Sequence, residues 1–200
     1  MTVTDVNVVK SAIFERPDDA NKGTLGSLLC VCGSYGMAGA AVMSAKGALR
    51  TGIGLAKCAL PRSIYPIVAQ TILESVYYPL SENADGRISK VNVPFLVSES
   101  CKSSATLVGC GLGVCDDTLK IVFSLIENST TPLVLDADAL NCVAKQPEIL
   151  LRKKAPIIIT PHPGEMSRLT GLATPLVNAE RQRVALDFAQ KYGVVTCLLY

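Results

Sequence analysis

The sequence is poor in the features that mark several large classes of protein. It has one histidine and no tryptophan, and charged residues make up only 18% of its 200 positions. Its 19 basic and 17 acidic residues nearly balance, which argues against the strong basic excess of a nucleic-acid-binding protein. No apolar run reaches the roughly 18 residues of a membrane span. The first residues lack a cationic stretch followed by an apolar one, so we predict no secretory signal.

Hydrophobic residues are abundant, at 49%, which excludes a disordered chain and supplies a sizeable core. Cysteine is also frequent, at positions 30, 32, 58, 101, 110, 115, 142 and 197. These positions do not form the paired spacing of a zinc site, and one histidine adds little to it. We therefore interpret the cysteines as reduced, mostly buried side chains, which predicts a reducing compartment such as the cytoplasm.

Short apolar runs alternate with helical patterns along the chain. We expect strands over residues 27–32, 55–60, 105–109, 132–135, 156–159 and 194–199, and helices over 38–50, 66–70, 116–127 and 175–192. Asp116 is the expected N-cap of its helix, with Leu119, Val122, Phe123 and Ile126 on one face. Because the strands do not alternate in polarity, they predict a parallel sheet covered by helices on both faces.

Two predicted strands lead into glycine-rich segments. Residues 33–40 (GSYGMAGA) follow the first strand, and residues 109–113 (GCGLG) close the third. Glycines allow a ligand to approach the backbone, and a helix N-terminus offers free N–H groups to an anion. Either segment is also compatible with a plain tight connection from strand to helix.

The next two strands are followed by polar side chains. Asp136, Asp138 and Asn141 come after the strand at 132–135. They suit hydrogen bonding to ligand hydroxyls, or an electrostatic and metal-organising role, although either aspartate could instead cap a helix.

His162 follows the strand at 156–159, between Pro161 and Pro163, with Glu165 and Arg168 one turn further on. The prolines fix its backbone at a strand-to-helix junction, which favours a ligand contact. Ligands of open α/β sheets bind beyond the carboxyl ends of the strands. The four clusters together therefore predict one binding cleft.

Six segments, in this order, resemble the ADP- or ATP-dependent NAD(P)H-hydrate dehydratases: residues 22–26 (KGTLG), 33–40, 48–55 (ALRTGIGL), 109–113, 135–141 (LDADALN) and 160–165 (TPHPGE). The resemblance covers nearly the whole chain, from about residue 22 to residue 195. It implies a ribokinase-like α/β fold with a mostly parallel sheet, in a single dehydratase-like domain over residues 1–200.

The resemblance also implies a function. Members of the family repair hydrated NADH and NADPH: a nucleotide, ATP or ADP with Mg²⁺, phosphorylates the new ring hydroxyl, and loss of phosphate restores the dinucleotide. We therefore expect a cytoplasmic hydro-lyase acting on the S-form of NADHX or NADPHX, a homo-oligomer without nucleic-acid or membrane partners.

By the same resemblance, Ala40, Gly113 and His162 contact the hydrated dinucleotide. No metal ligand is expected among the chain's own residues. Further contacts to substrate or nucleotide are expected from Gly111, Asp136, Asp138, Asn141, Glu165 and Arg168.

Two departures from the family pattern stand out. Cys110 replaces the proline that is usual in the glycine-rich loop. The family also continues with a strand ending in Lys-Gly and a Gly-(Thr/Ser)-Gly-Asp motif whose aspartate is the catalytic base, whereas this sequence ends at Tyr200. We therefore expect the C-terminal part of the fold to be missing, the base to lie beyond Tyr200, and the chain as given to be inactive.

Two alternatives remain open at this stage. One is a small-molecule kinase of the same fold, acting on a thiazole or pyrimidine alcohol. The other is a catalytically inactive nucleotide-binding fragment or paralogue. An inactive binder would hold the dinucleotide without turnover, whereas a vitamin-precursor kinase would ignore it.

Overall fold

The structure is a computed structural model that describes residues 18, 20 and 23–200. Lys22 of the first motif and the N-terminal stretch tested for a signal sequence lie outside the described residues.

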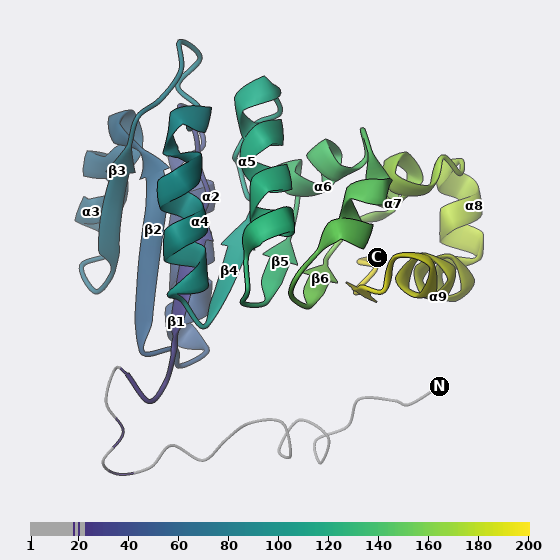
Figure 1. Cartoon of the computed structure of the whole chain (residues 1–200), viewed down its shortest axis with the longest axis horizontal. Helices are drawn as coiled ribbons and strands as arrows, with labels where there is room; N and C mark the ends of the chain where they lie inside the picture. Colours follow the sequence, from purple (N-terminus) through teal and green to yellow (C-terminus); the bar gives the residue numbers. More distant parts are fainter. Residues whose placement is uncertain (1–17, 19, 21–22) are drawn as a thin grey trace.

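The described part is built around a parallel sheet of seven strands in the order β3-β2-β1-β4-β5-β6-β7 (Figure 1). Every neighbouring pair is parallel, which confirms the predicted α/β class. The strands are β1 (Ser27–Val31), β2 (Leu55–Pro61), β3 (Val76–Leu80), β4 (Ala105–Val108), β5 (Leu133–Leu135), β6 (Ile157–Ile159) and β7 (Val195–Thr196).

Helices connect the strands and cover the sheet from both sides. They are α2 (Ala38–Arg50), α3 (Tyr65–Thr71), α4 (Val93–Cys101), α5 (Asp116–Asn128), α6 (Asp138–Val143), α7 (Pro163–Thr170), α8 (Thr174–Ala179) and α9 (Arg181–Tyr192), with 3-10 turns at η1 (Arg62–Ile64), η2 (Lys90–Asn92) and η3 (Pro147–Arg152). The small residues of α2 pack its backbone close to β1 and β2, and the chain leaves the helix through Gly52 at φ 96°.

Four predictions about these elements need correction. The helix expected over 175–192 is two helices, because Glu180 has non-helical dihedrals between α8 and α9. The last strand is confined to Val195–Thr196. Cys115, not Asp116, is the N-cap of α5. Leu119 and Phe123 are only partly buried, since the buried face of α5 is centred on its other apolar residues.

Two cores lie on the two sides of the sheet. In the view of Figure 1, α4 and α5 lie in front of the sheet and α2 behind it. The front core is aliphatic and includes Leu29, Val31, Leu135 and Ile159, all fully buried. The back core is built of small side chains and thiols: Cys30, Cys32, Ala41, Ala45 and Cys58, with Leu60, Ile64, Val68 and Ile72.

The prediction of doubly buried strands holds for β1 and fails at β6. Ile157 and Ile159 are buried on the front face, but Ile158 on the back face is 38% exposed. Its neighbour Val195 on β7 is 60% exposed, because α2 and α3 cover only the part of the back face nearer to β1–β3. Within the described part of the chain, no helix has the length and apolarity to cross a bilayer.

Candidate functional site

The four predicted clusters follow β1, β4, β5 and β6, which are neighbours in the sheet. Their carboxyl ends lie along one edge, the upper one in Figure 1. The structure therefore brings together, at one edge of the sheet, clusters that lie up to about 130 residues apart in the sequence. We call this row of four segments, which crosses the carboxyl end of the sheet after β1, β4, β5 and β6, the shelf.

The loop after β1 and the glycine-rich loop after β4 are bound to each other. The Gly33 N–H donates to the Cys110 carbonyl at 2.9 Å, and the buried Ser34 hydroxyl donates to the Gly111 carbonyl at 2.8 Å. Gly111 has φ 65°, and a β-carbon there would lie 2.7 Å from the Ala40 β-carbon. Ala40 and Gly111 thus touch, and both have to stay small.

Helix α2 presents an open N-terminus beside this contact. Its N-cap is Met37, which makes no side-chain capping bond, and its first turn contains no acidic residue. Free N–H groups at the positive end of a helix dipole bind anions. A hollow of about 370 Å³ adjoins this end of the helix and is lined in part by Tyr35, Ala38 and Gly39.

The two aspartates after β5 hold the neighbouring loops together. Asp136 accepts hydrogen bonds from the Thr160 hydroxyl at 2.8 Å and from the Cys110 thiol at 3.3 Å. Asp138 accepts one from the Gly113 N–H at 2.8 Å. Ala137, between them, has φ 51° and ψ −115°, a conformation that costs on the order of 1–3 kcal/mol in a non-glycine residue. The structure thus maintains a strained turn that directs both carboxylates toward the glycine-rich loop.

His162 is the N-cap of α7, a structural role that the sequence did not predict. Its Nδ1 accepts a hydrogen bond from the Gly164 N–H at 3.0 Å, which places the proton of a neutral ring on Nε2. Nε2 lies 3.3 Å from a carboxylate oxygen of Glu165, and the imidazole is 53% exposed. The Glu165 carboxylate in turn accepts from the His162 N–H at 3.0 Å. Burial raises the pKa of Glu165, against the opposing effect of that N–H donor.

Arg168 and Asn141 continue the network along the shelf. The Arg168 guanidinium donates to the Asn141 side-chain oxygen at 3.1 Å, and the Asn141 amide donates to Asp138 at 3.4 Å. A chain of hydrogen bonds therefore runs from α7 through α6 to Gly113. Of the predicted site residues, Arg168, Asn141, Asp138 and Gly113 form this chain, and Asp136 and Gly111 lie beside it. Ala40 lies near its Gly113 end, and His162 and Glu165 lie near its Arg168 end.

Sequence reasoning missed Arg87 and Tyr35. Arg87 lies in the connection between β3 and η2, and its side chain packs against Gly113. The Tyr35 N–H donates to the Gly86 carbonyl at 2.9 Å, and its side chain is 75% exposed beside the α2 hollow. An exposed aromatic residue inside a glycine-rich segment was the available signal for Tyr35, whereas nothing local indicated Arg87.

Comparison with known proteins agrees with this geometry. The family model described as NAD(P)H-hydrate dehydratase matches residues 28–199. The chain belongs to this family. It is 38% identical, over 176 residues, to a bifunctional NAD(P)H-hydrate repair enzyme of Thermofilum pendens, covering 88% of this chain but 34% of that relative. The chain thus spans about a third of that relative's length.

Solved structures confirm the ribokinase-like fold. An ADP/ATP-dependent NAD(P)H-hydrate dehydratase from Bacillus subtilis, co-crystallized with ATP/Mg²⁺, superposes with a TM-score of 0.78 at 27% identity, over 97% of this chain and 65% of that one. A ribokinase-like superfamily protein from Enterococcus faecalis gives a TM-score of 0.77 at 18% identity, over 94% and 62%.

The shelf of this NAD(P)H-hydrate dehydratase family member is not arranged to hold a metal ion by itself. Among the described residues, no three His, Cys, Asp or Glu side chains converge as ligands. The Asp136 and Asp138 carboxylates are also engaged, because each oxygen accepts a hydrogen bond from a protein donor.

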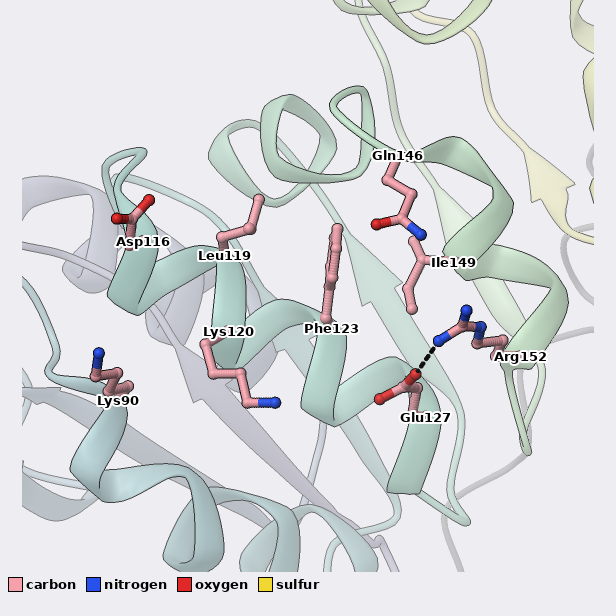
Figure 2. A pocket seen from close by; sticks show the side chains of 9 residues that line it. All are labelled: Lys90, Asp116, Leu119, Lys120, Phe123, Glu127, Gln146, Ile149 and Arg152. Atoms are coloured by element: carbon pink, nitrogen blue, oxygen red, sulfur yellow. Dashed lines mark hydrogen bonds and ion pairs between the residues drawn. The ribbon is translucent and has the colours of Figure 1, made fainter.

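A larger hollow, of about 560 Å³, lies on the outer face of α5 and is separate from the shelf (Figure 2). Leu119 and Phe123 form its floor, and an ion pair between Arg152 and Glu127, 3.0 Å long, closes one end. None of the residues that line it belongs to the six family segments.

Proposed function

We propose that this chain binds a hydrated nicotinamide dinucleotide at the carboxyl edge of its sheet, within an ATP- or ADP-dependent dehydration of (S)-NAD(P)H hydrate. The observation that carries the proposal is the contact of Ala40 with Gly111, which joins the open N-terminus of α2 to the glycine-rich loop. Membership of the dehydratase family supplies the reaction class.

The proposed reaction transfers a phosphoryl group from the nucleotide to the ring hydroxyl that hydration created. The C–O bond then breaks, and its electron pair leaves with the phosphate. A proton is lost from the neighbouring ring carbon, and the electron pair of that C–H bond restores the ring double bond. ATP would thus yield ADP and phosphate, with NADH or NADPH as the repaired product. We assign the described residues to binding and not to removal of the ring proton.

The residues of the shelf suit this ligand. The α2 N–H groups offer donors to the pyrophosphate, which carries the negative charge that a helix N-terminus favours. Ala40, a partly exposed small residue in the first turn of α2, leaves this part of the shelf without a bulky side chain for a flat ring to meet. The Nε2–H of His162 is a donor on a half-exposed ring, so it can exchange its long contact with Glu165 for a ligand oxygen.

Arg87 and Arg168 bring two cationic groups to the same shelf and suit phosphate or ribose oxygens. Tyr35 presents an exposed aromatic face beside the hollow at α2, suited to stacking on a base or nicotinamide ring. Magnesium is proposed as the companion of the nucleotide phosphates, since residues 18, 20 and 23–200 contain no group of three His, Cys, Asp or Glu side chains that could hold it. A single domain, homo-oligomerisation and a cytoplasmic location stay predictions.

Binding and turnover together test the proposal. Titration calorimetry should show binding of NADPH hydrate and NADP(H), and no binding of a thiazole or pyrimidine alcohol. Turnover is followed by recovery of dihydronicotinamide absorbance from the hydrate with ATP or ADP and Mg²⁺. Binding of an alcohol without the dinucleotide would show a small-molecule kinase instead. Dinucleotide binding with no turnover, in this chain and in one extended to family length, would show an inactive binder.

A further inference from the structure

Four cysteine side chains gather beneath α2, on the back face of the sheet. Cys30 on β1 stands opposite Cys58 on β2 in the parallel register. Cys32 follows two residues later on the same face, and Cys110, from the glycine-rich loop, packs against the same cluster. The cluster therefore connects the back core with the glycine-rich loop of the binding shelf.

Cys32 and Cys110 lie close together in this cluster. The Gly33 N–H donates to the Cys110 carbonyl at 2.9 Å, which holds the two backbone segments side by side at the ends of neighbouring strands. Val31 pairs with Val108, so Cys32 and Cys110 both follow closely on the ends of paired strands, with Cys110 one residue further along. The two thiols interact, since each shifts the pKa of the other. They are thus neighbours within one cluster.

The two thiols differ in accessibility and acidity. Cys32 is 1% exposed, whereas Cys110 is only partly buried. Interaction with Cys32, helped by the Ser44 hydroxyl, lowers the pKa of Cys110. The same interaction, together with burial, raises the pKa of Cys32. A partly exposed thiol with a lowered pKa, and a second thiol close to it, is the arrangement of a redox-sensitive cysteine and its resolving partner.

We propose that Cys110 and Cys32 are a peroxide-sensitive dithiol that closes to a disulfide beneath the dinucleotide shelf. In the first step the Cys110 thiolate attacks hydrogen peroxide, forms an S–O bond and displaces hydroxide, which leaves a sulfenic acid. In the second step the Cys32 sulfur attacks the Cys110 sulfur, the S–O bond breaks, and the leaving hydroxide takes up the Cys32 proton as water. Two thiols are oxidised and one peroxide is reduced to two waters.

The other close pair is not suited to this reaction. Cys30 and Cys58 face each other, but they are 2% and 1% exposed. Burial raises the pKa of both, so neither supplies a thiolate to an oxidant in water. Closure of the Cys32–Cys110 bond would also remove the hydrogen bond from Cys110 to Asp136, 3.3 Å long, and so alter the shelf itself.

Oxidation of the whole 200-residue chain with graded hydrogen peroxide tests the proposal. After remaining thiols are alkylated, peptide mass mapping should show Cys32 cross-linked to Cys110 as the first product, and a dithiol reductant should reverse it. Cys32→Ala should leave a sulfenic acid on Cys110 that dimedone traps. Cys30→Ala, a change in the same cluster and on the same strand, should leave the cross-link unaffected.

A first cross-link between any other cysteines would overturn the proposal, as would earlier oxidation of Cys101, Cys115 or Cys197 while Cys110 stays reduced. Mapping of the unmodified sequence decides this even where a variant fails to fold. The measurement uses no dinucleotide, so its outcome is independent of the proposed repair function.

Discussion

Two adjacent rows of paired residues, one on each face of the sheet, differ sharply in how far helices cover them. On the front face, Val31, Val108, Leu135 and Ile159 form one row across four strands, and each is fully buried. On the back face, the adjacent row is buried at β2 and β1 but opens toward β6 and β7, through Cys58, Cys30, Leu107, Val134, Ile158 and Val195. The strands are equally apolar, so helix coverage and not strand composition makes the difference.

The two parts of the candidate site differ in the same way. The half covered by α2 supplies backbone groups and small residues, because Ala40 and Gly111 must fit between helix and sheet. The half near β5 and β6 supplies polar side chains, among them Asp138 and His162. The predictions below test the coverage of the two rows, then each half of the site.

The largest effect is expected from a matched pair on β6. Ile159→Ala should lower the free energy of unfolding by about 2–5 kcal/mol, because it leaves a cavity in the front core. Ile158→Ala, the same change one residue earlier, should cost about 1 kcal/mol or less, since its side chain is 38% exposed. Urea unfolding measures both. Equal losses would show that the back of β6 is covered in solution.

The sequence predicts an element well where its two ends carry clear signals. Alanine-rich α2 was predicted with both boundaries correct, because its pattern starts after a glycine-rich turn and stops before Gly52. Strand β3 was missed because Pro79 and half-exposed residues disguise it, and proline is tolerated there only because β3 is an edge strand. The break at Glu180 carries no glycine or proline signal, so α8 and α9 read as one helix.

The candidate site was predicted as a set of segments but not as a network. The strand ends could be read from the sequence, since parallel neighbours must share an edge. The contact between Arg87 and Gly113 could not, because it joins a turn after an unrecognised strand to a loop elsewhere in the sheet. The capping role of His162 depends on the rotamer of its ring, which composition does not determine.

The backbone half of the site is tested by Ala40→Leu. The larger side chain would push against Gly111 and fill the space proposed for the ring, so NADPH affinity should fall about a hundredfold, or ~2.7 kcal/mol. Ala48→Leu makes the same change two turns further along α2 and should bind normally. Calorimetry gives the affinity and thermal unfolding the stability. If Ala40→Leu melts far below Ala48→Leu, Ala40 serves packing and not binding.

The side-chain half is tested at His162 with two variants. His162→Ala removes both the ring and the helix cap, whereas His162→Asn keeps a side-chain oxygen that can accept from the Gly164 N–H. Both should weaken NADPH binding by ~1–3 kcal/mol through loss of the Nε2–H donor. Only the alanine variant should also lose stability, by about 1 kcal/mol. Normal binding by the asparagine variant would leave His162 with its capping role alone.

The smallest effect concerns Glu165, the partner of that cap. Burial raises its pKa above the usual 4.5, so the folded protein holds the proton more tightly than the unfolded chain does. Its contribution to stability is therefore full below pH 4.5 and is lost as pH rises through the raised pKa of the folded state. Glu165→Gln retains an acceptor for the His162 N–H but cannot titrate. The wild type should therefore lose stability relative to this variant as pH rises from 4.5.

Glu99 on α4, a second buried glutamate, provides the control of opposite sign. Burial opposes its ionisation, but hydrogen bonds from Lys102 and Tyr78 outweigh burial and lower its pKa. Its contribution is present above pH 4.5 and is lost as pH falls through the lowered pKa, so the wild type should lose stability relative to Glu99→Gln on acidification. Urea unfolding across the acidic range measures both differences. Slopes of the same sign would show that Glu165 is as well solvated or paired as Glu99, and that the cap at His162 is more open to water than its geometry indicates.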